Sequence, residues 1–316
     1  MVQPRVVALG GGHGLAATLG ALRRITSDIT AIVTVADNGG SSGRLRDELP
    51  ILPPGDLRMA LAALCADDDW GKSWAEIMQY RFTSGQWLEG HPVGNLLLAA
   101  LWDRDEDPVT GLDRVASLLK VVGRVLPMAS APLDIEGTFI SSLGRVVVRG
   151  QEQVATAKGK LESLKILPSD VTARPEAIQA IAEAEWITMG PGSWFSSVLP
   201  HLLVSEQRYA LTQSKAKRIV LLNLDAHPNS SGDEFAGHDP EEHLNLIHHY
   251  APEMFCDYVI ADTGVVRNRA SLSEKVADMG GKLIVADLSK APGSIQHDGE
   301  KLVSVFGHIF GNTLIG

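Results

Sequence analysis

The sequence predicts an α/β fold with a parallel sheet, helices on both of its faces and a small β-rich insertion. Short apolar runs alternate with helical patterns along most of the chain, which is typical of βα units. The first apolar run, residues 6–9, leads directly into glycines and then into a helical pattern over residues 15–22. A strand, a glycine turn and a helix in this order are typical of a Rossmann-like sheet. We therefore expect one such domain over residues 1–316.

Composition limits the class of protein and its partners. The formal net charge of −10 at pH 7 argues against a nucleic-acid-binding surface. Cys65 and Cys256 form no Cys-x-x-Cys pair, so we expect two reduced, packed thiols. The first strand starts after five residues, which leaves no room for a signal peptide, and no apolar run approaches the ~20 residues of a membrane span. We expect a cytoplasmic protein without membrane insertion.

The first glycine turn predicts an anion site. Glycines permit a tight turn and close backbone approach, and the free N–H groups of the following helix favour a phosphate. Gly10 and Gly12 match the first two positions of the dinucleotide-binding pattern, whereas Leu15 stands at the third. The turn therefore favours phosphate binding without indicating NAD in particular, and a turn with only a structural role is the alternative. The ligand-binding candidates here are Gly11, Gly12, His13 and Gly14.

The second strand, predicted over residues 29–36, ends at an acidic residue. Asp37 is followed by Asn38, glycines and two serines. In a Rossmann-type fold, an acidic residue at this point accepts hydrogen bonds from a ribose hydroxyl. We expect a polar loop at the carboxyl edge of the sheet, with Ser41, Ser42 and Arg44 near the ligand. A solvated loop with a chance acidic residue is the alternative.

Two helix starts follow. Residues 53–55, Pro-Pro-Gly, open a helix, and either helix capping or ligand contact explains Asp56 and Arg58. His91 and Asn95 precede a nearly all-apolar helix over residues 96–102. Asn95 carries donors and acceptors that suit a base or sugar edge, and simple N-capping is the alternative.

Residues 124–168 predict the insertion, because short β-branched runs there lie between glycines and prolines. Regular alternation resumes with a helix at 175–185 and a strand at 186–189. A second glycine turn then supplies the candidates Gly190, Gly192 and Ser193. Two such turns, one in each half of the chain, suggest a diphosphate or nucleotide sugar held between them.

The remaining strands are predicted over residues 218–224, 258–261 and 282–286, and Asn223 lies at the end of the first. The polar segment 225–239 suggests a lid over the site as a hypothesis. Three histidines on a helix over residues 240–250 do not have the spacing of a zinc site, and we predict no metal. No nucleophile elbow, kinase signature or Walker lysine occurs, so no catalytic residue is assigned.

Five motifs taken together resemble the YvcK/gluconeogenesis-factor family (UPF0052), which is distantly related to the CofD family of 2-phospho-L-lactate transferases. The motifs are GGGHGL at 10–15, VTVADNGGSSGRLR at 33–46, PPGDLR at 53–58, GHPVGNLL at 90–97 and MGPGS at 189–193. This resemblance implies a Rossmann-like fold that binds UDP-sugars, UDP-N-acetylglucosamine above all. It also implies a role in cell shape and envelope growth on gluconeogenic carbon sources rather than an established reaction.

The chain departs from the family pattern at several positions. His13 stands where many members carry threonine, and Asn38 where many carry a second aspartate. Near the C-terminus His297 and Asp298 fit an Arg-His-Asp run, but Gln296 replaces its arginine, which implies an altered affinity for a UDP-sugar. Losing the carboxylate at position 38 weakens the hypothesis of a metal-assisted transferase, because Mg²⁺ prefers carboxylate oxygens.

Two hypotheses follow. The first is a nucleotide-sugar-binding regulator without turnover, which needs no cofactor. The second is a transferase, similar to the 2-phospho-L-lactate transferases, in which Asp37 and Asp56 hold Mg²⁺ while Arg44 and Arg58 neutralise charge. NAD(P) as a ligand, a homodimer and a regulatory protein partner are left open by the sequence.

Overall fold

The computed structural model describes residues 3–105, 107–142, 144–224 and 240–311. A seven-stranded sheet with the order β10-β9-β8-β7-β1-β2-β3 forms its centre, and neighbouring strands in it pair in parallel. The strands are β1 (Val6–Gly10), β2 (Ile29–Val33), β3 (Arg124–Pro127), β7 (Trp186–Met189), β8 (Lys217–Leu221), β9 (Tyr258–Asp262) and β10 (Lys282–Ala286). The predicted parallel α/β fold is confirmed.

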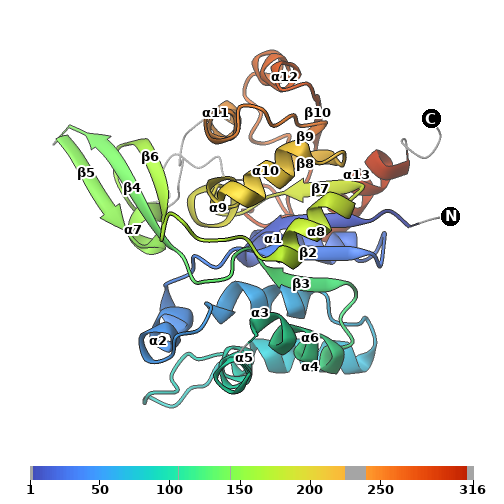
Figure 1. The fold of residues 1–316 in the computed structure, drawn as a ribbon. Coiled ribbons are helices and arrows are strands. Elements are labelled where there is room, and N and C mark those ends of the chain that lie inside the picture. The colour runs from blue at the N-terminus through green and yellow to red at the C-terminus, as the bar shows by residue number, and fades with distance from the viewer. Residues whose placement is uncertain (1–2, 106, 143, 225–239, 312–316) are drawn as a thin grey trace.

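The central strands are apolar because both faces of the sheet are covered by helices. All five residues of β1 are buried, and its neighbours β2 and β7 are almost completely buried. Helices α1, α3 and α13 lie on one face, whereas α8, α9 and α10 lie on the other (Figure 1). The core between these layers includes fully buried Leu9, Leu19, Trp194 and Phe306.

The helices before the insertion are α1 (Gly12–Leu22), α2 (Gly40–Glu48), α3 (Pro54–Ala63), α4 (Asp69–Gln79), α5 (Val93–Arg104) and α6 (Pro108–Leu119). Those after it are α8 (Pro175–Glu183), the π-helix η1 (Trp194–Val198), α9 (Pro200–Leu203), α10 (Ser205–Gln213), α11 (Pro240–Tyr250), α12 (Arg269–Asp278) and α13 (Gly299–Gly311). None of the helices in the described part of the chain is both long enough and apolar enough to cross a membrane.

The insertion is smaller than the sequence predicts. Residues 124–127, which we expect in the insertion, form β3 and pair in parallel with β2 in the central sheet. The separate sheet contains β4 (Asp134–Ser141), β5 (Gly144–Arg149) and β6 (Lys160–Leu167), with antiparallel pairing and β4 in the middle. Helix α7 (Gln151–Ala155) joins β5 to β6. The cause of the error is that no helix separates the short apolar run of β3 from the first insertion strand, β4.

The chain order of the strands creates a switch point between β1 and β7. From β1 the chain proceeds outward through β2 and β3, whereas the strands from β7 to β10 extend from the other side of β1. In open α/β sheets, ligands bind at the carboxyl ends of the strands where the strand order reverses. The β1–β7 edge is therefore the expected place for a site.

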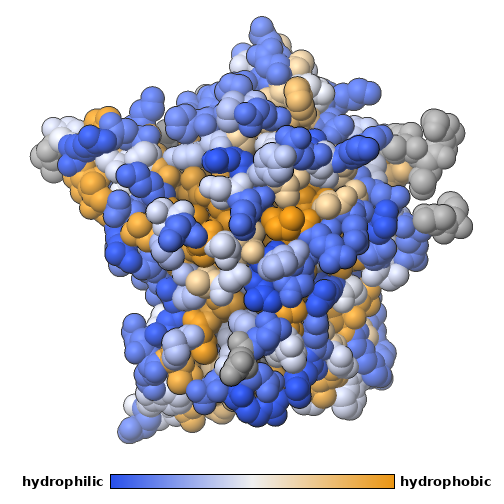
Figure 2. Space-filling view, viewed as in Figure 1, coloured by the Kyte–Doolittle hydropathy of each residue, from blue (hydrophilic) through white to orange (hydrophobic). Residues whose placement is uncertain are grey.

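Figure 2 shows the face that carries α8 and α10, which is mostly hydrophilic with apolar patches between the helices. One groove on this face, of about 860 Å³, is lined by residues that include Ile178, Ala182, Tyr209 and Ala210. Cys65 and Cys256 are both buried as free thiols, as expected. Burial raises the pKa of Cys65 to about 11 and that of Cys256 to about 12, so neither thiol is a thiolate near neutral pH.

Candidate functional site

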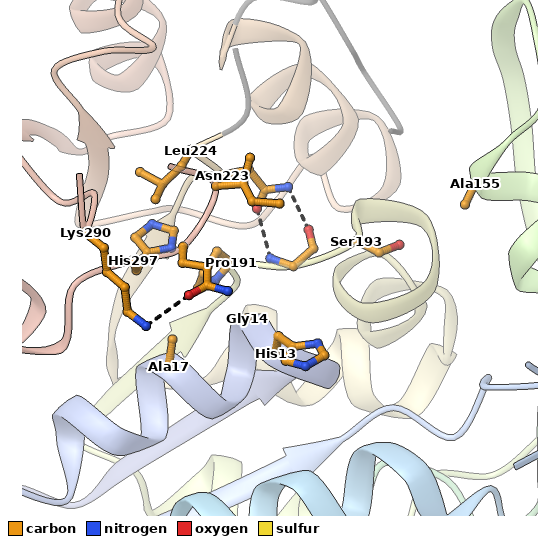
Figure 3. A pocket seen from close by; sticks show the side chains of 13 residues that line it. His13, Gly14, Ala17, Ala155, Pro191, Ser193, Asn223, Leu224, Lys290 and His297 are labelled. Atoms are coloured by element: carbon orange, nitrogen blue, oxygen red, sulfur yellow. Dashed lines mark hydrogen bonds between the residues drawn. The ribbon is translucent and has the colours of Figure 1, made fainter. Parts of the chain in front are cut away.

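A cavity of about 450 Å³ lies at the carboxyl ends of the central strands (Figure 3). Its walls come from the turns after β1 and β7, the end of β8, the segment after β10 and helix α7. The lining residues are His13, Gly14, Ala17, Ala155, Pro191, Gly192, Ser193, Asn223, Leu224, Lys290, Ile295, Gln296 and His297. Its position at the switch point makes it the candidate binding site.

The two glycine turns touch one another at this cavity. A Cβ atom added to Gly14 would lie 2.1 Å from the backbone oxygen of Pro191, so only glycine permits this approach. Thr18 donates a hydrogen bond of 3.2 Å to the carbonyl oxygen of Gly190, which holds the same contact from within α1. The two turns therefore lie in direct contact, and a diphosphate or nucleotide sugar held between them stays a prediction.

Helix α1 begins earlier than the sequence predicts. It starts at Gly12, which has a φ of +57°, and not near Leu15. His13 and Gly14 therefore belong to its first turn, where backbone N–H groups have no partner within the helix. The exposed His13 and the backbone of Gly14 face the cavity (Figure 3).

The second turn differs from the predicted strand–turn–helix copy of the first. Instead of a regular helix, five residues of π-helix and the four-residue α9 follow it. Ser193 is the N-cap of η1, and its Oγ accepts a hydrogen bond from the Ser196 N–H group. Asn223 holds Gly192 through two bonds of 2.9 Å, because its Nδ2 donates to the Gly192 carbonyl and its Oδ1 accepts from the Gly192 N–H group.

Asp56 occupies part of the predicted phosphate site. Helix α3 begins at Pro54 with Pro53 as its N-cap, so the interpretation of Asp56 as an N-cap is wrong. The Asp56 carboxylate instead accepts a hydrogen bond from the backbone of Gly12. Burial, followed by the nearby charge of Asp37, raises the pKa of Asp56 to about 7. A phosphate at this turn must therefore lie toward His13 and Gly14.

Asp37 and Asn38 bind the insertion. Gln151 of α7 donates from Nε2 to Asp37 Oδ1 over 2.6 Å, and its backbone N–H donates to Asn38 Oδ1 over 3.1 Å. The Gly39 N–H also donates to Asp37 Oδ1. These contacts join α7 to the segment after β2. Helix α7 also packs against η1, which follows the second turn, and Ala155 lines the cavity. The role of Asp37 and Asn38 in holding a ribose stays a prediction.

The predicted polar loop around Ser41 is wrong, because residues 40–48 form helix α2. Ser42 is buried in its first turn and accepts from the Gly55 N–H group over 3.1 Å. Arg44 is exposed, and its guanidinium donates to the carbonyl oxygen of Glu89 over 2.7 Å. Neither side chain is among those that line the cavity.

Ser41, Asn95, Arg58 and His91 form a buried hydrogen-bonded network. Asn95 donates to Ser41 Oγ over 2.9 Å and accepts from Arg58 Nε over 2.8 Å, and Ser41 Oγ lies 2.8 Å from His91 Nδ1. Burial, with a smaller contribution from the Arg81 charge, lowers the pKa of Arg58 to about 10. Pro92 is the N-cap of α5, so simple N-capping by Asn95 is wrong.

None of the four side chains of this network lines the cavity. Each of its four side chains is at most 3% exposed except Ser41, at 8%. Polar groups buried in this way are stabilised by their mutual hydrogen bonds and specify the packing of α2, α3 and α5. Their contact with a ligand stays a prediction.

The segment after β10 supplies cavity residues that no strand–turn–helix motif indicates. Lys290 and Ile295 carry no motif, and Gln296 and His297 enter the sequence argument only through the resemblance. These residues could have been predicted from their position after the parallel strand β10, because the carboxyl ends of parallel strands lie at the same edge of the sheet. His297 is buried with its Nε2 atom unpartnered among the described residues, and burial lowers its pKa to about 4.

No group of three or more metal-ligating side chains occurs among the residues that the structure describes. Asp37 and Asp56 are close enough for the charge of one to raise the pKa of the other. The lid predicted over residues 225–239 lies outside the described residues.

Fold and site together define a parallel α/β protein with a cavity at the switch point between two glycine turns. The family described as 2-phospho-L-lactate transferase CofD matches residues 6–296. The chain belongs to this family.

Several relatives carry a gluconeogenesis-factor name. The gluconeogenesis factor of Listeria monocytogenes is 33% identical over 311 residues, covering 95% of this chain and 94% of the relative. A protein of Mycobacterium tuberculosis, provisionally named in the same way, is 46% identical over 307 residues, covering 95% of this chain and 88% of the relative. The crystal structure of a UPF0052 family member from Bacillus halodurans superposes with a TM-score of 0.84 at 31% identity, covering 96% of this chain and 99% of the other. The resemblance inferred from the five motifs is therefore confirmed at the level of the family.

Proposed function

We propose that the cavity binds a nucleotide sugar, UDP-N-acetylglucosamine in particular, and that the protein acts as a regulator through binding and without turnover. The observation that carries this proposal is the contact between the two glycine turns at the switch point. The first turn of α1 presents backbone N–H groups near His13 and Gly14, and such groups favour a phosphate. The cavity volume of about 450 Å³ lies within the range of small-molecule sites.

The walls of the cavity suit a ligand with both polar and apolar parts. Ala17, Leu224 and Ile295 supply apolar surface, while Gln296 and the second turn supply donors and acceptors. The gluconeogenesis-factor names of the relatives support a link to gluconeogenesis. The physiological part of the proposal is a cytoplasmic role in cell shape and envelope growth on gluconeogenic carbon sources. A second protein would then bind the ligand-bound form in preference to the free form.

UDP-N-acetylglucosamine should stabilise the protein against heat. Saturation to about 100 times Kd adds about 2.7 kcal/mol to the free energy of unfolding, because the ligand binds the native state only. A shift of the melting temperature by a few degrees is expected in differential scanning fluorimetry. NADPH and GDP serve as controls. No shift with the UDP-sugar at millimolar concentration, together with a clear shift by either control, would refute the proposed ligand.

A second candidate is an Mg²⁺-dependent transferase acting on a nucleotide donor. The family description and the proximity of Asp37 to Asp56 favour it. Those two carboxylates would hold the ion, which would neutralise charge on a transferred phosphoryl-linked group. Against it, both carboxylates already accept hydrogen bonds, from Gly39 and Gln151 at Asp37 and from Gly12 at Asp56.

Titration of UDP-N-acetylglucosamine with Mg²⁺ and with EDTA separates the two candidates. For a binding protein we expect the same Kd, within about twofold, under both conditions, because no ion bridges the ligand to a carboxylate. The transferase would instead lose binding in EDTA, regain it with Mg²⁺, and release UMP or UDP over hours. Asn38→Asp would then raise the affinity for Mg²⁺ by adding a second carboxylate beside Asp37.

A further inference from the structure

The charged groups around the cavity are distributed unevenly. Lys290 is the one lysine or arginine among the described lining residues, and none of them is an aspartate or glutamate. The Lys290 ammonium donates a hydrogen bond of 3.0 Å to Gln296 Oε1, which is a neutral acceptor. By contrast, Lys301 on the neighbouring helix donates to Asp287 Oδ2 over 2.7 Å and is neutralised by it. Among the described residues, the Lys290 ammonium therefore has no carboxylate partner at the cavity.

The other side of the first glycine turn is acidic. The Asp56 carboxylate lies against Gly11 and Gly12, and Asp37 lies close to it. These charges repel an anion from that side, while Lys290, in the segment after β10, attracts it into the cavity. An anionic ligand in the cavity is consequently oriented with its charge toward Lys290.

The backbone fixes Lys290 and Gln296 opposite one another. The Lys290 N–H donates to the Gln296 carbonyl over 3.0 Å, and Ser289 and His297 form an antiparallel bridge beside them. This short hairpin brings both side chains to the cavity wall, and Figure 3 shows Lys290 there. The amide of Gln296 thus holds the ammonium in place without neutralising it.

We propose that Lys290 is the residue that selects ligands with a charged phosphate group, and that Gln296 is its positioning residue. The inference rests on the proposed nucleotide site and adds the feature of the ligand that the site recognises. A nucleoside diphosphate should gain affinity from Lys290, whereas the uncharged nucleoside should gain none. A charge-assisted hydrogen bond to a phosphate depends on the ammonium and is weakened by salt.

The test measures the Kd of UDP by calorimetry and that of uridine by competition, for the wild type and four variants. Lys290→Ala and Gln296→Glu should each raise the Kd of UDP about tenfold or more. The first substitution removes the ammonium, and the second gives the ammonium a carboxylate partner within the protein. Uridine should change less than about twofold in both variants. Lys290→Arg should restore most of the affinity for UDP. Lys72→Ala is the control, because it removes an exposed lysine of α4 that does not line the cavity.

The outcomes distinguish this inference from the proposed function. If Lys290→Ala binds UDP as the wild type does, the selection by Lys290 is refuted while the nucleotide site stands. Equal losses for UDP and uridine would show a structural role only and would also refute it. If wild-type protein binds neither UDP, uridine nor UDP-N-acetylglucosamine, the proposed function fails and this inference fails with it. Circular dichroism of each variant confirms that the fold is retained.

Discussion

Gly14→Ala is expected to abolish nucleotide binding and to lower the free energy of unfolding by about 3 kcal/mol. The added Cβ would lie 2.1 Å from the Pro191 oxygen and 2.8 Å from the Gly192 Cα atom, both in the backbone of the second turn. Because backbone atoms cannot rotate away as a flexible side chain can, the two turns must separate. Overpacking of this kind costs about 1–3 kcal/mol or more. Urea unfolding gives the stability, and calorimetry with UDP-N-acetylglucosamine gives the binding.

Gly20→Ala is the matched control in the same helix. No atom lies within 4 Å of a Cβ added to Gly20, and alanine stabilises a helix interior by about 0.5–1 kcal/mol relative to glycine. We therefore expect opposite signs of the stability change at two positions six residues apart. A Gly14→Ala variant as stable as Gly20→Ala would mean that the turns do not approach each other as described.

Asp56→Asn should stabilise the protein at pH 8 by about 2–4 kcal/mol. The pKa of Asp56 is raised from 3.8 to about 7, and each unit corresponds to about 1.4 kcal/mol. The native state therefore binds a proton more tightly than the unfolded chain does. The contribution of this carboxyl group to stability is full below pH 3.8 and is lost as the pH rises through 7. Asparagine keeps an oxygen that can accept from the Gly12 N–H group and has no charge to bury.

The difference in stability between Asp56→Asn and the wild type should grow from pH 5 to pH 7 and level off above. Urea unfolding at several pH values measures it, with the exposed Asp278 mutated to asparagine as a control. The stability of the variant must be compared with that of the wild type at each pH, because His201 and His297 make the free energy of unfolding change with pH in the opposite direction. Burial lowers the pKa of each to about 4, so their contribution is present above pH 6.5 and is lost as the pH falls through 4. A variant less stable than wild type at pH 8 would contradict the destabilising role of the Asp56 charge.

The sequence by itself determined the order of the elements along most of the central sheet. Four buried apolar residues before glycines determine β1, and similar buried runs determine β7 and β9. These predictions succeed because burial on both faces requires a nearly continuous apolar run, which is visible without tertiary information. The same reasoning failed at β3, since residues 124–127 have no local feature that says which sheet they join.

Some features of the candidate site were likewise predictable from the sequence, and others only from the tertiary structure. Glycine turns are readable locally because their backbone conformations favour glycine, and both turns do line the cavity. Only the tertiary structure decided that Asp56 hydrogen-bonds Gly12, that Asn95 is buried against Arg58, and that Gln151 holds Asp37. These contacts join residues 37 to 114 positions apart, so no local pattern contains them. Lys290 reaches the cavity for the same physical reason: parallel strands bring distant carboxyl ends to one edge of the sheet, and the fold, not the local sequence, selects which side chains meet there.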